Sequence, residues 1–94
     1  MNDGIFQWDD DKAASNLAKH GVRFEAARGV FKDPFAIEEL DDRRDHGEER
    51  FILIGMASAR LLTVIYTMRG DCIRIISARG AEPYEQRLYH EHNS

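Results

Sequence analysis

The sequence lacks several features that would place it in common classes of protein. Its 94 residues include one cysteine, Cys72, so no disulfide forms within the chain, and a reducing compartment is expected. No apolar stretch reaches the roughly 18 residues of a membrane span, and no basic segment followed by an apolar core opens the sequence. We therefore expect a cytoplasmic protein with no membrane partner.

Short motifs of familiar chemistry are also missing. The sequence has no glycine-rich phosphate loop, no serine nucleophile motif and no cysteines at zinc-site spacing. His90 and His92 stand near the end of the sequence, where a frayed tail is a better interpretation than a metal site. Cys72 has no paired base in the sequence and is interpreted as a packing residue. We expect neither a metal nor an organic cofactor.

Positive charge is scarce overall and concentrated in one segment. The net charge is −4, which argues against a protein that coats nucleic acid without specificity, because such proteins are basic. Residues 61–80 hold Arg69, Arg74 and Arg79 against Asp71, a local charge of +2 that leaves −6 for the rest. An acidic body with one basic segment can bind an anion at a focused site.

Two helices are expected in the first third of the chain. Apolar residues at helical spacing predict a helix over residues 9–19, with aspartates at its start and Gly21 just after its end. The spacing of apolar residues predicts a second, shorter helix over about 23–31, which the Asp33-Pro34 pair stops. Residues 5–8 favour a strand but are too few to form one alone.

From residue 35 the spacing of apolar residues changes from that of helices to that of strands. Because strands joined by two- or three-residue links pair antiparallel, we expect an antiparallel meander of about four strands and then a C-terminal helix. The fold class is therefore α+β, with two N-terminal helices, in one domain spanning residues 1–94. The predicted strands cover 35–40, 50–57, 61–69 and 72–79, the predicted loop covers 41–49, and the last helix covers 81–92.

Regular alternation along the strands places the arginines. It puts Ile75 and Arg79 on one face of the last strand and Arg74 on the other. Arg69 lies at the turn end of its strand, and Arg79 lies at the opposite end of the neighbouring strand. Arg60, at the preceding turn, is expected at the same end of the sheet as Arg79.

Two blocks of the sequence resemble the BrnT-type toxins of bacterial type II toxin–antitoxin pairs. The first is FQWDDDKAASNLAKHGVRFEAARGVFKDP, residues 6–34, and the second runs from Glu49 to Tyr89. The likeness is specific because KHGV at 19–22 and RIISAR at 74–79 occur together at the family's spacing. Family members often carry a basic residue after the RIISAR block, whereas this chain has Gly80, Glu82 and Pro83 nearby.

The resemblance implies a fold, an activity and a partner. The fold would be similar to that of the RelE and ParE toxins, and the activity would be RNA cleavage that inhibits translation. The partner would be a BrnA-type antitoxin with a ribbon-helix-helix DNA-binding part, in a hetero-oligomer that reaches operator DNA only through the antitoxin. Two other functions stay open: a non-enzymatic co-repressor that pairs with the antitoxin, and a toxin that acts on gyrase.

The implied chemistry requires no metal, because RNA carries its own nucleophile in the 2′-hydroxyl group. A fixed cation must stabilise the charge that gathers on the phosphate oxygens, and the planar fork of arginine suits that role. Arg79 is the first candidate for this cation and Arg69 is the second. Lys12 and Lys19 are seven residues apart, on one helix face, and are candidates to hold phosphates.

Other candidates would exchange protons or contact the RNA. His20 titrates near neutrality and is a candidate acid or base. Glu85 is a candidate base or a partner that orients Arg79. Tyrosine rings can stack on bases, which makes Tyr89 a candidate. The predicted RNA-binding residues are Lys19, Arg60, Arg74 and Tyr89.

Each candidate also has a purely structural interpretation. The two leading arginines are also compatible with solvated strand ends or with ion pairs to Glu82 or Glu85. The lysines fit an exposed amphipathic face. His20 fits a partner of the helix dipole beside Gly21, and Glu85 fits a carboxylate on a helix surface.

Overall fold

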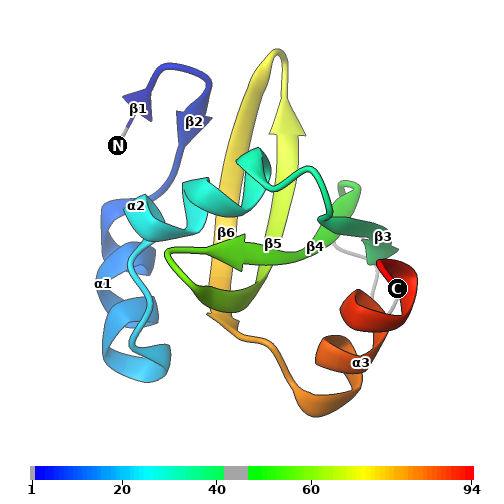
Figure 1. The fold of residues 1–94 in the computed structure, drawn as a ribbon. Helices are drawn as coiled ribbons and strands as arrows, with labels where there is room; N and C mark the ends of the chain where they lie inside the picture. The colour runs from blue at the N-terminus through cyan, green and yellow to red at the C-terminus, as the bar shows by residue number, and fades with distance from the viewer. Residues whose placement is uncertain (1, 42–46) are drawn as a thin grey trace.

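The structure is a computed structural model that describes residues 2–41 and 47–94 (Figure 1). It confirms the α+β class and the C-terminal helix. Residues 42–46 of the predicted loop lie outside the described residues. The elements are β1 (Asn2–Asp3), β2 (Phe6–Gln7), α1 (Asp10–His20), α2 (Phe24–Ala27), the 3₁₀ helix η1 (Arg28–Lys32), β3 (Ile37–Asp41), β4 (Arg50–Ala57), β5 (Arg60–Arg69), β6 (Cys72–Gly80) and α3 (Pro83–His92).

The strands form one six-stranded sheet in the order β1-β2-β6-β5-β4-β3. The meander from β3 to β6 is antiparallel, as predicted. The prediction that the helices come first is wrong, because the strands β1 and β2 precede α1. The prediction of a purely antiparallel sheet is also wrong, because β2 pairs with β6 in parallel. Strands of two residues carry no readable period, and only the pairing of Phe6 with Ile73 and of Gln7 with Arg74 reveals them.

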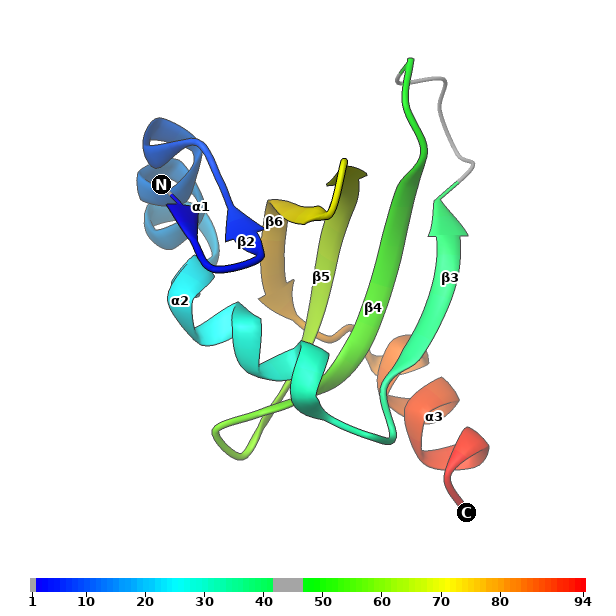
Figure 2. The ribbon, with the colours of Figure 1, turned by 90° about the horizontal axis from the view of Figure 1, so that it is seen from above.

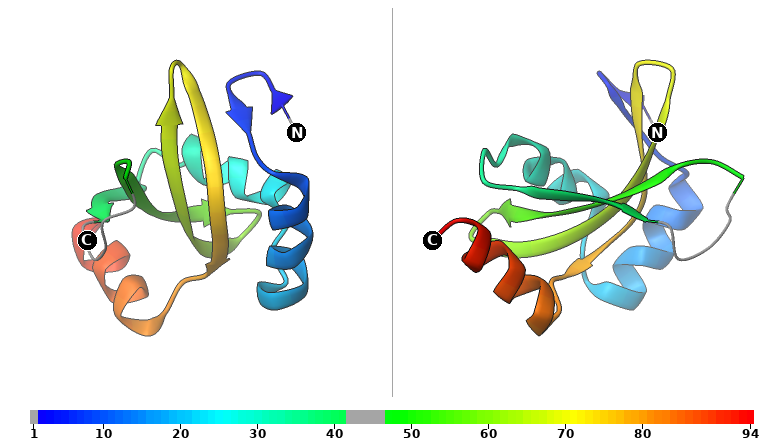
Figure 3. Two further views of the ribbon diagram at one scale, coloured as in Figure 1. Left: turned by 180° about the vertical axis from the view of Figure 1, so that it is seen from behind. Right: turned by 90° about the vertical axis from the view of Figure 1, so that its right-hand side faces the viewer.

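The two faces of the sheet carry different helices. Phe24, Ala27 and Val30, from α2 and η1, are fully buried and share the core with Val64 and Ala78 of the sheet. We call this side the helical face. Figure 2 shows α1 and α2 far from α3, and in the right-hand view of Figure 3 α3 and η1 lie on opposite sides of β4 and β5. The side that carries α3 is the open face. No described helix is long and apolar enough to cross a membrane.

Helix α1 begins and ends one residue later than predicted, and the predicted causes of both ends are confirmed. The side chain of Asp9 accepts hydrogen bonds from the backbone N–H groups of Asp11, at 2.9 Å, and Lys12, at 3.1 Å. Gly21 ends the helix with a φ of 70° and donates its N–H to the carbonyl of Leu17. The second predicted helix is present as α2 followed by η1. Its Gly29 has no Cβ, which lets the helix approach Ala57 closely.

Helix α1 completes the edge of β6. Strand β2 pairs only with Ile73 and Arg74, so the rest of this edge lacks a neighbouring strand. The side-chain amide of buried Asn16 takes that place, donating to the carbonyl of Ala78 at 2.8 Å and accepting from its N–H at 3.1 Å. It also donates to the carbonyl of Val22 at 3.0 Å. One amide therefore joins the helix, the following loop and the sheet.

A β-bulge at Ile76 corrects the predicted faces of β6. Ile65 pairs with Ser77, but the next residue of β5, Tyr66, pairs with Ile75, so Ile76 is an extra residue. The prediction that Ile75 and Arg79 share a face is therefore wrong. Ile75 is buried in the core of the helical face, whereas Arg74, Ser77 and Arg79 pair with the residues of β5 that face the other way.

Candidate active site

Arg79 and Glu85 form the most developed polar contact on the open face. Arg79 stands near the end of β6, and Glu85 lies in the first turn of α3. Nη1 of Arg79 donates to Oε1 of Glu85 at 2.7 Å, and Nη2 donates to Oε2 at 3.1 Å. This two-point contact fixes the plane of the guanidinium group as well as its position. The ion-pair interpretation of Arg79 is thus confirmed, with Glu85 as the partner.

The carboxylate of Glu85 is buried among donors. Only 2% of the residue is exposed, so its interpretation as a helix-surface carboxylate is wrong. Oε1 also accepts from the Thr63 hydroxyl at 3.0 Å and from the backbone N–H of Glu82 at 2.8 Å, the latter as part of a capping box. The hydroxyl of Tyr84 lies 3.4 Å from Oε2. Strand and helix therefore meet at one carboxylate.

The hydrogen bonds keep this pair charged. Burial alone would raise the pKa of Glu85, but the hydrogen bonds from Arg79, Glu82 and Thr63 outweigh it, and the pKa is lowered. The hydrogen bond to Glu85 raises the pKa of Arg79 against the opposing effect of burial. A carboxylate with these properties holds a cation in place and is poorly suited to accept a proton.

Arg79 keeps donors for a ligand. Its side chain is 26% exposed. Of its five N–H groups, two bond Glu85 and one reaches the carbonyl of Gly80 at 3.3 Å. Within the described residues, Nε–H and the second hydrogen of Nη2 have no protein partner. These donors, on an oriented and permanently charged group, suit a phosphate oxygen.

Arg74 lies toward the other end of β6, and Lys12 lies in the first turn of α1. The bulge turns Arg74 to the open face, where its Nη1 donates to the side chain of Gln7 at 3.1 Å. The backbone N–H of Lys12 and the charges of Lys12 and Arg74 lower the pKa of Asp9. Both cations therefore lie within electrostatic reach of the N-terminus of α1.

Arg69 lies far from Arg79. It pairs with Cys72 at the β5–β6 turn, whereas Arg79 pairs with Thr63, six residues away along β5, or about 20 Å. The guanidinium of Arg69 is 3.9 Å from the carboxylate of Glu48, and its side chain is 54% exposed. The two leading arginines therefore lie apart in the structure. This agrees with the prediction, which placed them at opposite ends of neighbouring strands.

The remaining candidates divide between the edge and the interior. Arg60 lies beside the end of β6, because its Nη2 would be 3.0 Å from a Cβ on Gly80. Lys19 is exposed and His20 half-buried in the last turn of α1. Tyr89 is buried, and its hydroxyl donates to Asp33 at 2.6 Å. A buried ring offers no stacking surface, so the structure gives Tyr89 a packing position in place of the predicted RNA contact.

Two residues of the site were not among the sequence candidates. Thr63 is fully buried in the middle of an apolar strand, and its hydroxyl is directed at Glu85. Tyr84 is 51% exposed and stands next to the Arg79–Glu85 pair. The available signal for Tyr84 was its position directly before Glu85 in a helix that Pro83 opens. Thr63 gave no signal beyond a hydroxyl in an apolar run.

Comparison with known proteins identifies the family of this chain. A family model described as "Ribonuclease toxin, BrnT, of type II toxin-antitoxin system" matches residues 8–85, a span that includes Arg79 and Glu85. The chain belongs to the BrnT family. Its class is that of ribonuclease toxins that act on RNA and are paired with an antitoxin. No curated protein matches the chain. The resemblance seen in the two sequence blocks is confirmed.

Proposed function

We propose that this chain is a metal-independent endoribonuclease that inhibits translation by cutting RNA at Arg79 on the open face. The supporting observation is the orientation of the Arg79 guanidinium by a buried, charged carboxylate, with two N–H groups left for a ligand. The arrangement of two helices, a meander and a C-terminal helix supports a RelE-like fold. Residues 1–94 would act as one toxin domain.

The chemistry follows from the position of Arg79. The 2′-oxygen of RNA attacks the neighbouring phosphorus, the bond to the 5′-oxygen breaks, and a cyclic phosphate remains. Negative charge gathers on the non-bridging oxygens, where the free donors of Arg79 stabilise it. Because Arg79 is already oriented by Glu85, little reorganisation is needed when the charge develops. The fixed guanidinium provides the charge that a metal ion provides in other nucleases.

Glu85 and Tyr84 would have different roles. The carboxylate of Glu85 accepts five hydrogen bonds and has a lowered pKa, so we assign it the positioning of Arg79. The hydroxyl of Tyr84, a residue that is 51% exposed, stands beside the pair, and we assign it the donation of a proton to the leaving 5′-oxygen. The 2′-hydroxyl proton passes to solvent. The predicted role of Glu85 as orienting partner is retained, and its role as base is not.

The other cations would hold flanking phosphates. Lys12 and Arg74 at the start of β6, and Lys19 and His20 along α1, line the edge that Asn16 joins to the sheet. Because each side chain can donate a hydrogen bond to a phosphate and none is fully buried, each can contact an RNA strand that crosses the open face. Arg69 would make a more remote phosphate contact.

A BrnA-type antitoxin with a ribbon-helix-helix part would neutralise the toxin, and operator DNA would be bound through the antitoxin alone. The support is the family to which residues 8–85 belong. The RNA substrate of such a toxin is met in the cytoplasm, where translation takes place. We expect a hetero-oligomer of toxin and antitoxin.

RNA cleavage by the purified protein tests this function. Arg79→Ala should lower the cleavage rate by about 10²–10³-fold, the usual loss when one preorganised charge contact is removed. Arg87→Ala, on the exposed side of α3, is the matched control and should cut at the wild-type rate. Cleavage should persist in EDTA. Uncut RNA at high enzyme concentration, with folded protein, would contradict the proposal.

One observation favours a second function. Glu85 neutralises the charge of Arg79, and Glu82 adds a further negative charge nearby. A paired arginine also suits a structural role in a non-enzymatic co-repressor that binds the antitoxin. In that case the wild-type protein would not cut RNA at any concentration, while its complex with the antitoxin would still repress the operator.

A further inference from the structure

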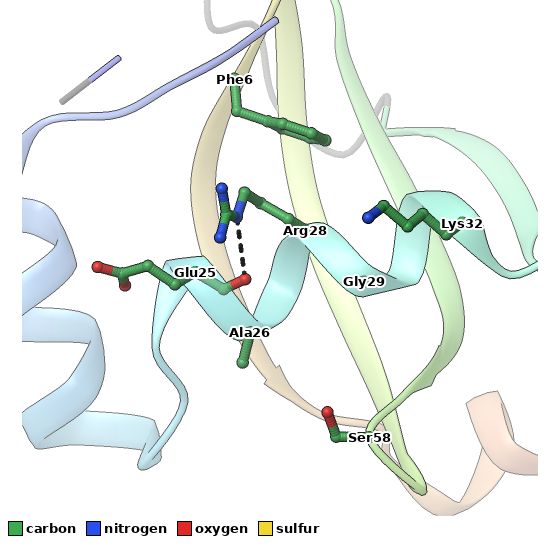
Figure 4. A pocket seen from close by; sticks show the side chains of 7 residues that line it. All are labelled: Phe6, Glu25, Ala26, Arg28, Gly29, Lys32 and Ser58. Carbon is green, nitrogen blue, oxygen red and sulfur yellow. Dashed lines mark hydrogen bonds between the residues drawn. The ribbon is translucent and has the colours of Figure 1, made fainter. Parts of the chain in front are cut away.

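A basic groove runs over the helical face, on the side of the sheet away from Glu85. It consists of two adjoining hollows that share Ala26 and Ser58. The first, of about 290 Å³, lies beside Phe6, Arg28 and Lys32 (Figure 4). The second, of about 270 Å³, is lined by Arg23, Arg60 and Leu62 among others. The lining of the groove thus comes from β2, α1, the residues that join α1 to α2, α2 itself, η1 and the β4–β5 hairpin.

The charge of this groove contrasts with that of the chain. Four cations line it, Arg23, Arg28, Lys32 and Arg60, against the single acid Glu25, although the net charge of the protein is −4. Figure 4 shows the Lys32 amine pointing toward Arg28, while the Glu25 carboxylate points away from the space between them. Arg28 donates from Nε to the backbone carbonyl of Glu25 at 3.1 Å, which fixes its side chain at the groove.

The groove begins where the candidate active site ends. Gly80 follows Arg79, and a Cβ on Gly80 would lie 3.0 Å from Nη2 of Arg60. The guanidinium of Arg60 therefore lies against the backbone of Gly80 at the end of β6. Arg79 on the open face and Arg60 on the helical face are separated by this one residue. The cations thus follow one path around the end of the sheet, from Arg79 to Arg60 and on to Lys32.

We propose that this groove binds the single-stranded RNA that leads away from the phosphate at Arg79. The identity of the ligand rests on the proposed function, but the binding of RNA here does not depend on cleavage. Proteins that bind single strands combine a basic groove with aromatic rings on which bases stack. Phe6 supplies a ring next to Arg28 (Figure 4). Arg28 and Lys32 both lie on η1 and line the same hollow, so both can contact one RNA strand there.

The test measures binding separately from cleavage. The probe is a fluorescent single-stranded RNA of about 12 nucleotides with 2′-O-methyl groups, which removes the nucleophile and prevents cutting. Anisotropy is followed as salt is varied, for wild type, Lys32→Gln, Arg23→Gln and Arg28→Gln. Arg87→Gln removes one charge on α3, outside the groove, and is the matched control. Lys32 and Arg23 are exposed, so these two variants should fold even if Arg28→Gln does not.

Each groove variant should bind the RNA about 3–10-fold more weakly than wild type. The slope of the logarithm of the binding constant against the logarithm of the salt concentration should become less steep by about 0.7, the value for one lost phosphate contact. Arg87→Gln should match wild type. Equal affinities for wild type, control and groove variants would overturn the inference even if the protein cuts RNA. A groove that binds poly-glutamate but not the RNA would also overturn it, in favour of an acidic protein segment. Loss of cleavage in Arg79→Ala with groove binding intact tests the active site alone.

Discussion

Thr63 and Arg79 stand opposite each other on β5 and β6, and both donate a hydrogen bond to the same oxygen of Glu85. The strand ladder fixes the distance between the two donors, and the carboxylate from α3 closes the arrangement. Arg79 therefore owes its orientation to the sheet as much as to its ion-pair partner. A long, flexible side chain is held as a rigid group, which is the condition for electrostatic catalysis without reorganisation.

Replacing the orienting carboxylate should impair catalysis more than binding. In Glu85→Gln the amide nitrogen would face the donors of Arg79 and Thr63, so the two-point contact is lost. We expect kcat for RNA cleavage to fall by about 10²-fold with KM changed far less, because Arg79 stays present but is misoriented. Glu91→Gln, on the exposed part of α3, should leave both values unchanged. A rise in KM with kcat intact would contradict the positioning role.

The lowered pKa values predict how stability depends on pH. The pKa of Glu85 lies below its ordinary value of 4.5, and the pKa of Asp33 lies below its ordinary value of 3.8. In each case the hydrogen bonds to the carboxylate outweigh the effect of burial. The folded state then binds fewer protons than the unfolded state in this range. Stability should be fully present above about pH 5 and be lost as the pH falls through the folded pKa values. Urea denaturation at several pH values, with Glu85→Gln showing a shallower loss, checks this.

Removing the amide that joins α1 to β6 should destabilise the fold. Asn16→Ala leaves the N–H and carbonyl of Ala78 buried without their partner. The free energy of unfolding should fall by about 2–4 kcal/mol, as expected for unsatisfied buried polar groups. Urea denaturation measures this, with Ser15→Ala on the exposed side of α1 as the control. A loss no larger than that of the control would show that water replaces the amide.

A methyl group at residue 55 should disturb the packing beneath η1. A Cβ on Gly55 would lie 3.0 Å from side-chain atoms of Ala36 and Val30 and 3.1 Å from Oδ2 of Asp33. Gly55→Ala should cost about 1–3 kcal/mol of stability by overpacking. Gly29→Ala, where only Ala57 approaches as closely, should cost less. Thermal denaturation of the two variants side by side would reveal the difference, and equal melting temperatures would contradict it.

The sequence predicted the elements with clear local causes. The aspartates and Gly21 marked both ends of α1, and the short links marked the antiparallel meander. It could not predict the parallel pairing of β2 with β6, because two residues carry no period and the partner is distant in sequence. Nor could it predict the bulge at Ile76, since an extra residue in an apolar strand leaves the composition unchanged.

The sequence predicted part of the candidate site, and the rest depends on contacts between distant residues. Arg79 and Glu85 were identifiable from the motif that carries them, and the structure places them in direct contact. The face that Arg74 shares with Arg79 depends on the bulge, and Tyr89 is buried with its hydroxyl bonded to Asp33, which is 56 residues away in the sequence. Contacts of this kind are set by the tertiary fold. Local spacing does not encode them.

The most direct measurement is the single-turnover rate of RNA cleavage by folded Arg79→Lys. Lysine keeps the positive charge but lacks the planar fork that contacts both oxygens of Glu85 and a phosphate at once. If an oriented guanidinium stabilises the scissile phosphate, Arg79→Lys should cut about 10²-fold more slowly than wild type and Arg87→Lys should cut at the wild-type rate. Cleavage by Arg79→Lys at the wild-type rate would contradict the account.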